Sequence, residues 1–171
     1  MKNNKLKKIV AAAIIAAAYA GLTYISAAFG IAYGPIQFRI SEALTILPLF
    51  TPVAIPGLTV GCFLANIMSY NPIDLLFGTF ATLVACLGTY YLRNIKIKGF
   101  PLLSFLCPII ANAIIVGFEI AVFFVKTDAI LITFLISALQ VALGEVVVLF
   151  LLGTPFYYTL NSHKREISKW L

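Results

Sequence analysis

Long hydrophobic runs, broken at only a few polar positions, dominate the chain. The uncharged stretches are residues 9–38, 43–73, 75–92, 99–118 and 129–162, the last with Glu145 inside it. About 20 consecutive apolar residues are enough for a helix to cross the hydrocarbon core of a bilayer. The pattern therefore predicts a membrane protein built from spanning helices.

The stretch 43–73 contains three prolines at four-residue spacing, Pro48, Pro52 and Pro56. A proline inside a helix removes a backbone donor and clashes with the preceding turn, at a cost of about 3 kcal/mol or more. One continuous helix is therefore unfavourable. We expect a short helix over 41–50, a proline-rich turn, and a second helix that begins near residue 54.

The basic residues test this division independently, because Lys and Arg collect at the cytoplasmic ends of spanning helices. They form three clusters: Lys2, Lys5, Lys7 and Lys8; Arg93, Lys96 and Lys98; Lys164, Arg165 and Lys169. If 43–73 were one span, three helices would separate the first cluster from the second, and the two would face opposite sides. With two helices in 43–73, four spans separate them and all three clusters face the cytoplasm. Only Arg39 and Lys126 then lie outside.

The sequence thus predicts an all-α integral membrane protein with both termini in the cytoplasm. We expect a single membrane domain over 1–171, with six helices at about 8–29, 41–50, 54–70, 73–92, 101–125 and 129–158. The apolar outer loop at 30–39 should fold back over the bundle. The basic start followed by an apolar run also suits a signal peptide, but the run from Ile9 to Phe29 is long enough to span, which favours a retained helix.

Composition supports a membrane location. Hydrophobic residues make up 62% of the chain and charged residues 11%, whereas soluble domains are about half apolar and about a quarter charged. The net charge is +6. The basic residues lie at the termini and in one loop, where they can contact anionic lipid headgroups, so no nucleic-acid partner is expected. Cys62, Cys86 and Cys107 are far apart in apolar runs, so neither a disulfide framework nor a metal or other cofactor is indicated.

Five ionisable residues lie at or near membrane depth: Arg39, Glu42, Asp74, Glu119 and Glu145. Such residues are costly there and mark functional paths or internal pairs. Arg39 and Glu42 are three residues apart, which suits either a helix-start ion pair with Ser41 as the cap or contact with a ligand. Asp74 follows Asn-Pro at a helix start, so it is either a cap residue or a binding residue.

Glu119 and Glu145 favour a polar cavity. Asn112 precedes Glu119 by seven residues and shares its helix face, and Gln140 lies on a polar face beside Glu145. Too few basic residues lie at membrane depth to neutralise both carboxylates. They are either held neutral or bonded to the backbone, or they accept N–H groups from a ligand, and a carboxylate accepts two such bonds at once.

Small residues recur at four-residue spacing in the first helix, at Ala12, Ala16 and Ala20, and again at Gly57 and Gly61. This spacing allows close helix approach, either inside the molecule or against a partner membrane protein. The chain has no G-x-x-x-x-G-K-[ST] loop and no evident nucleophile–base pair, which disfavours an ATPase or another enzyme.

Four segments resemble the QueT family of substrate-binding (S) components of energy-coupling factor (ECF) transporters. They are QFRISEALTILPLFTPVAIPG at 37–57, NPIDLLFGTFATL at 71–83, NAIIVGFE at 112–119 and ALQVALGE at 138–145. The resemblance implies high-affinity binding of queuosine precursors, 7-deazaguanines such as preQ1, preQ0 or queuine. It also implies assembly with a transmembrane coupling protein (EcfT) and two cytoplasmic ATPases in the bacterial plasma membrane.

The resemblance also implies roles for individual residues. Glu119 and Glu145 would bind the donor edge and the amine of the ligand, with Asn112 and Gln140 in support. Arg39 would lie in a lid, on the ring oxygen or paired with Glu42. Phe38 or Tyr33 would stack on the ring or pack within the lid. Asn66 and Asp74 complete the expected site, and Ala12, Ala16 and Ala20 would dock on the coupling protein.

Two alternatives stay open on the sequence. The chain is an S component for another vitamin-like solute, or it is a stand-alone secondary transporter that couples a small polar or cationic molecule to protons through Glu119 and Glu145.

Overall fold

The computed structural model describes residues 2–33, 36–67, 69, 71–126 and 128–163. Its elements are α1 (Lys2–Ala28), the 3₁₀ helix η1 (Ile40–Leu49), α2 (Ala54–Ile67), α3 (Pro72–Tyr91), α4 (Leu102–Glu119), η2 (Ile120–Phe124), α5 (Ile130–Val148), η3 (Leu149–Gly153) and α6 (Thr154–Ser162). Within these ranges the fold is all-helical, and the only strand-like feature is a single bridge between Ile97 and Phe100.

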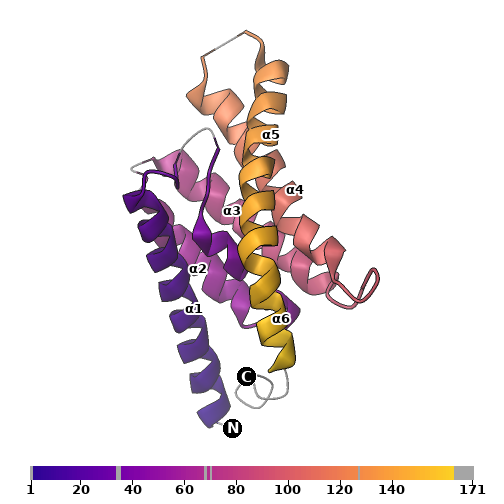
Figure 1. The fold of residues 1–171 in the computed structure, drawn as a ribbon. Coiled ribbons are helices and arrows are strands. Elements are labelled where there is room, and N and C mark those ends of the chain that lie inside the picture. The colour runs from indigo at the N-terminus through magenta and orange to yellow at the C-terminus, as the bar shows by residue number, and fades with distance from the viewer. Residues whose placement is uncertain (1, 34–35, 68, 70, 127, 164–171) are drawn as a thin grey trace.

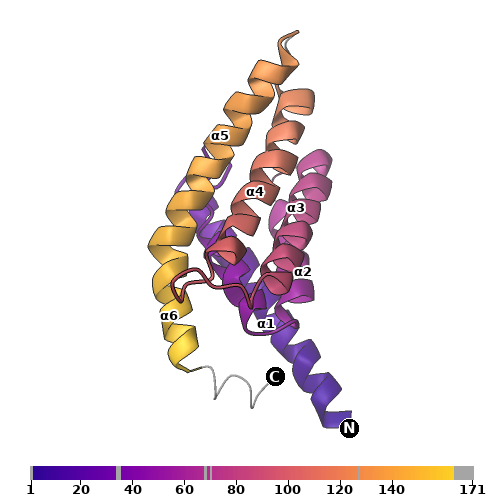
Figure 2. The same cartoon turned by 90° about the vertical axis from the view of Figure 1, so that its right-hand side faces the viewer.

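The helices run alternately up and down, so that the start of α1 and the end of α6 lie at the same end of the molecule (Figure 1). The loop after α1 and the loop after α4 lie toward the opposite end, and α5, η3 and α6 form one long helical rod (Figure 2). The basic residues at 164, 165 and 169, which the charge pattern placed with the other two clusters, lie outside the described residues.

Four helices are long and apolar enough to cross a membrane, which makes this a multi-pass membrane protein. They are Asn4–Ala28, Pro72–Tyr91, Leu102–Phe124 and Ile130–Ser162. The other two are shorter. Ten 3₁₀ residues in η1 rise roughly 20 Å and fourteen α-helical residues in α2 roughly 21 Å, against about 30 Å for the hydrocarbon core.

The structure differs from the expected helix limits in three places. The first helix begins at Lys2 rather than at residue 8, and the last one continues to Ser162. The short helix at 40–49 is 3₁₀, because Pro48 and Pro52 supply no backbone donor and would interrupt an α-helical ladder twice. The second short helix begins at Ala54, but its expected end at Tyr70 falls outside the described residues.

Close packing between α1 and α2 explains the small residues in both. A Cβ built on Gly61 would lie 2.8 Å from the Ala16 carbonyl oxygen and from Tyr19 Cβ, so nothing larger than glycine fits without displacing α1. Ala16 and Ala20 are buried inside the chain. Internal packing therefore accounts for the burial of Ala16 in this conformation. Ala12 is only half-buried, and docking of the stripe on a partner protein stays a prediction.

The loop between α1 and η1 is tied down over the bundle. The Tyr33 hydroxyl donates to the carbonyl of Ala65 at 3.0 Å, and the Ile40 amide donates to Ser26 Oγ at 3.0 Å. On the other side of the loop, a Cβ on Gly144 would lie only 2.1 Å from the carbonyl oxygen of Gln37. The loop is therefore held between α2 and α5, and it closes one end of the space between the helices.

Candidate functional site

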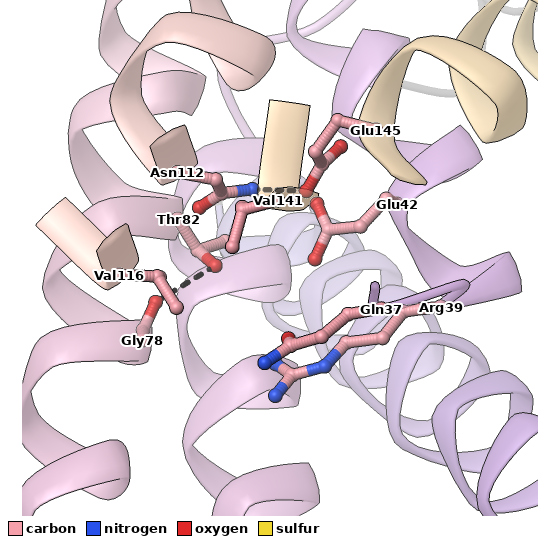
Figure 3. Close-up of a pocket in the computed structure, with 9 residues that line it drawn as sticks. All are labelled: Gln37, Arg39, Glu42, Gly78, Thr82, Asn112, Val116, Val141 and Glu145. Carbon is pink, nitrogen blue, oxygen red and sulfur yellow. Dashed lines mark hydrogen bonds between the residues drawn. The ribbon is translucent and has the colours of Figure 1, made fainter. Parts of the chain in front are cut away.

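A small polar space in the middle of the helices, which we call the inner cage, lies directly beneath the loop. Its lining residues are Gln37, Arg39, Glu42, Gly78, Thr82, Asn112, Val116, Val141 and Glu145 (Figure 3). The loop, η1, α3, α4 and α5 all contribute to it. The free volume is about 10 Å³, which is room for about one water molecule.

Two buried carboxyl groups dominate the inner cage. Glu42 is 4% exposed and Glu145 is 6% exposed. The Tyr19 hydroxyl donates to Glu42 Oε1, and the Asn112 amide donates to Glu145 Oε1. The second oxygen of each group, Oε2, is buried and has no hydrogen-bond partner. Figure 3 shows the Glu42 carboxyl group next to the Glu145 oxygen that Asn112 binds, so the two carboxyl groups lie side by side in one small space.

A larger space, the outer pocket, lies on the loop side of the inner cage. Its volume is about 640 Å³, within the roughly 300–1,000 Å³ of small-molecule sites. Its lining residues are Tyr33, Gln37, Ser69, Asn71, Asp74, Val116, Glu119, Ile120, Phe124, Val125, Thr133, Ile136, Ser137 and Gln140. Gln37 and Val116 line both spaces, so the two spaces are neighbours.

Glu119 is the most conspicuous residue of the outer pocket. It is 1% exposed, and neither of its carboxylate oxygens has a hydrogen-bond partner. A buried carboxylate without partners is unfavourable. It is therefore the group in this pocket that would gain most from an N–H donor or a cation supplied by a ligand.

Arg39 is held away from the inner carboxylates. Its guanidinium lies 3.8 Å from Asp74 Oδ1 and donates to Asn66 Oδ1 and to the Ala32 carbonyl, both at 3.2 Å. It also lies over the Tyr33 ring, 5.0 Å from its centre. Burial, the largest single effect, lowers the pKa of Arg39, but the charges around it, Asp74 foremost, together outweigh burial and the net pKa is raised, so Arg39 stays charged.

The expected pairing of Arg39 with Glu42 is therefore wrong. Arg39 precedes η1 with an extended backbone, φ −91° and ψ 106°, which directs its side chain toward α2 and α3 rather than along the face of η1. Ser41 is not a helix cap either: its Oγ accepts from the Thr23 hydroxyl at 2.7 Å, and η1 has no side-chain cap bond.

The start of α3 shows why Asp74 is available to Arg39. Asn71 caps this helix, since its side chain accepts from the Ile73 amide at 2.9 Å. The cap role that the sequence allowed for Asp74 is thus taken by Asn71, and Asp74 pairs with Arg39 at the rim of the outer pocket.

The structure divides the other expected site residues into three groups. Asn112 and Glu145 lie in the inner cage, whereas Glu119 and Gln140 line the outer pocket. Asn66 is fully buried behind both and orients Arg39. Phe38 lines neither space, and its backbone amide donates to the Ile31 carbonyl at 2.8 Å.

Among the polar residues, Gln37 and Thr82 of the inner cage escaped the sequence reasoning, as did Tyr19, which bonds Glu42. Gln37 carried a usable signal, because it is a polar residue inside an otherwise apolar loop next to Arg39. Tyr19, the only aromatic residue between Lys2 and Thr23, stands in an alanine-rich helix and carried a weaker one. Thr82 has no sequence signal, since its hydroxyl simply donates to the Gly78 carbonyl of its own helix.

Acidic residues outnumber basic ones around the two spaces. The carboxylates of Glu42, Asp74, Glu119 and Glu145 face a single guanidinium, that of Arg39. The described part of the chain holds no group of three or more His, Cys, Asp or Glu residues arranged to bind a metal ion. The arrangement suits a small molecule that is rich in N–H donors or carries a positive charge.

Comparison with known proteins agrees with the sequence resemblance. Residues 9–162 match the family described as QueT transporter. A curated relative from Lactococcus lactis subsp. cremoris (strain MG1363), named queuosine precursor transporter QueT, is 42% identical over 84 residues. These residues are 49% of this chain and 50% of the relative, so the match spans about half the length of each protein. No solved structure matches the chain. Since the family match covers most of its length, the chain belongs to the QueT transporter family.

Proposed function

We propose that this chain is the substrate-binding S component of an ECF-type importer and takes up queuosine precursors, the 7-deazaguanines preQ1, preQ0 or queuine. Family membership supports a transport role, and the name of the Lactococcus relative supports the substrate class. In this proposal the outer pocket holds the deazaguanine ring.

One observation carries the proposal: the outer pocket combines a ligand-sized volume with the unpartnered carboxylate of Glu119. A 7-deazaguanine presents N1–H and an exocyclic amine side by side, which is a donor pair that one carboxylate accepts at once. Ser137 and Gln140 from α5 add hydroxyl and amide groups to the same pocket, and Tyr33 adds an aromatic face.

Calorimetric binding to the purified protein in detergent tests the proposal. We expect preQ1, preQ0 or queuine to bind tightly and guanine and riboflavin to bind much more weakly. Glu119→Gln should weaken binding by about tenfold or more, about 1.4 kcal/mol, because an amide replaces one acceptor oxygen with a donor. A matched control is Asp128→Asn, which removes an exposed carboxylate outside both spaces and should leave binding unchanged.

Absence of binding to every deazaguanine would overturn the proposed substrate class. Wild-type affinity in Glu119→Gln would instead remove Glu119 from the site while leaving the substrate class in place.

The proposal includes the membrane arrangement and the partners. The chain crosses the bacterial plasma membrane six times with both termini in the cytoplasm, which agrees with the shared end of α1 and α6 (Figure 1). A coupling protein, EcfT, and two ATPases supply the energy. In this proposal the stripe of Ala12, Ala16 and Ala20 docks on EcfT. Ala16 and Ala20 are buried within the chain as the structure stands, and Ala16 packs against Gly61 of α2.

One observation favours a second function, a stand-alone proton-coupled transporter. The inner cage holds Glu42 and Glu145 close together without a basic partner of their own, and two adjacent carboxylates readily share a proton. Uptake into liposomes that contain only this chain, driven by a proton gradient, would support this function. Dependence of uptake on the ATPases would exclude it.

A further inference from the structure

The two spaces differ in size and chemistry, and this difference bears on which part of a ligand enters each. The outer pocket of about 640 Å³ accommodates a bicyclic ring, whereas the inner cage of about 10 Å³ accommodates a group the size of one water molecule. The two spaces share the lining residues Gln37 and Val116, so they are neighbours. A short substituent is the only part of a ring-bound ligand for which the inner cage has room.

The inner cage is built to receive positive charge. Glu42 and Glu145 each have one oxygen held by a neutral donor, Tyr19 or Asn112, and one buried oxygen that is free. Arg39 lines the cage, but its guanidinium is engaged by Asp74 and Asn66. The two free oxygens thus lack a donor. A primary ammonium group would supply one, because it carries three N–H donors on a nitrogen of about the size of a water oxygen.

Resting on the proposed function, we propose that the inner cage binds the aminomethyl ammonium group of the ligand while Glu119 binds the ring in the outer pocket. Glu42 and Glu145 each accept one N–H of the ammonium. Tyr19 and Asn112 hold one oxygen of each carboxyl group in place. The site then selects preQ1, whose 7-substituent is a primary ammonium.

The other two precursors fit this arrangement less well, for different reasons. PreQ0 carries a neutral nitrile, which offers no N–H to the two carboxylates. Queuine carries a cationic amine, but a bulky ring is attached to its nitrogen, and the free volume of the cage leaves no room for it. Charge therefore disfavours preQ0, and size disfavours queuine.

Calorimetry with preQ1 and preQ0 on four isosteric variants tests the inference. For the wild-type protein we expect preQ1 to bind at least about tenfold more tightly than preQ0, because two charge-assisted hydrogen bonds are made only by the ammonium. Glu42→Gln and Glu145→Gln should weaken preQ1 by about tenfold or more and leave preQ0 within about threefold. Both variants keep an oxygen for Tyr19 or Asn112, which preserves the packing.

Thr59→Val is the matched control. Thr59 lies on α2 outside both spaces, and its hydroxyl donates to the Ile55 carbonyl of its own helix at 2.8 Å, so the ratio of the preQ1 and preQ0 affinities should be unchanged. Glu119→Gln should weaken both ligands alike, because both carry the same ring.

The outcomes separate the two proposals. Binding of preQ0 as tight as that of preQ1, or equal weakening of both ligands by Glu145→Gln, overturns the ammonium assignment and leaves the substrate class standing. If queuine binds more tightly than preQ1, the size argument fails. If neither preQ1 nor preQ0 binds, the proposed function itself is wrong.

Discussion

At the scale of single residues, the site depends on donors that hold carboxylates in place. Tyr19 on α1 is fully buried, and its hydroxyl bonds Glu42 on η1, 23 residues away. Asn112 on α4 does the same for Glu145 on α5. A carboxylate oxygen that loses its buried donor pays the desolvation cost without compensation, so these neutral residues matter to the site as much as the acids do.

Removing one of these donors gives a direct prediction. Tyr19→Phe should lower the free energy of unfolding by about 1–3 kcal/mol, because Glu42 Oε1 is left without a partner. Ligand affinity should fall as well, since the Glu42 carboxyl is no longer oriented. Thermal unfolding in detergent and calorimetry measure the two effects.

Tyr24→Phe is the matched control for this change. Tyr24 lies on the same helix and its hydroxyl also makes a hydrogen bond, to the Leu64 carbonyl at 2.8 Å, but it is exposed. The Tyr24→Phe variant should lose much less stability than Tyr19→Phe, and its affinity for the ligand should not change. Equal effects of the two substitutions would show that the Tyr19–Glu42 bond has no special role.

At the scale of elements, glycine decides how closely the helices and the loop approach one another. Gly61 lets α1 lie against α2, and Gly117 lets α4 lie against α5, where a Cβ would meet the Ala138 backbone at 2.8 Å. Gly144 has the tightest neighbour of all, the Gln37 carbonyl. The loop therefore depends on a residue of α5 for its position over the site.

Gly144→Ala should displace the loop. A Cβ at 2.1 Å from the Gln37 oxygen cannot be accommodated by a side-chain movement, because the neighbour is backbone. We expect ligand affinity to fall by about tenfold or more, although alanine favours the helix itself by about 1 kcal/mol. Calorimetry measures the affinity, and proteolysis within 30–39 reports the loosened loop.

Gly153→Ala, in the continuation of the same helical rod, is the control. Its nearest neighbours would lie at 3.6 Å, an ordinary contact distance, so binding should not change. Unchanged affinity in Gly144→Ala would mean that the loop position does not contribute to the site.

At the scale of the whole molecule, the open question is how η1 and α2 sit in the bilayer. Together they run down and back up between α1 and α3 (Figure 1), but each is about 10 Å shorter than the hydrocarbon core. The proposed six crossings require the turn at 50–53 to reach the cytoplasmic surface.

Cysteine accessibility tests this arrangement. In a variant that lacks Cys62, Cys86 and Cys107, single cysteines at Lys5, Pro52 and Asp128 should react with a membrane-impermeant maleimide from different sides. We expect positions 5 and 52, which is exposed, to react from the cytoplasmic side and position 128 from the outside. If position 52 reacts from neither side, η1 and α2 form a re-entrant pair and the chain crosses four times.

The sequence by itself determined most of the helical layout. Hydrophobic length and the spacing of Pro48, Pro52 and Pro56 are local properties, so they placed the division of 43–73 and the start of α2 near residue 54 without a structure. The rarity of ionisable residues at membrane depth likewise pointed to Glu119 and Glu145, because their cost there does not depend on the fold.

Only the tertiary structure decided which residues pair. Arg39 bonds Asp74 and Asn66 instead of Glu42, and Tyr19 reaches Glu42 from another helix. Ala16 and Ala20 are buried within the chain. Spacing along one helix defines a face. The direction of that face and its partners depend on how the helices pack together, and no local sequence pattern specifies that packing. For the same reason, the division into an inner cage and an outer pocket emerged only from the assembled fold.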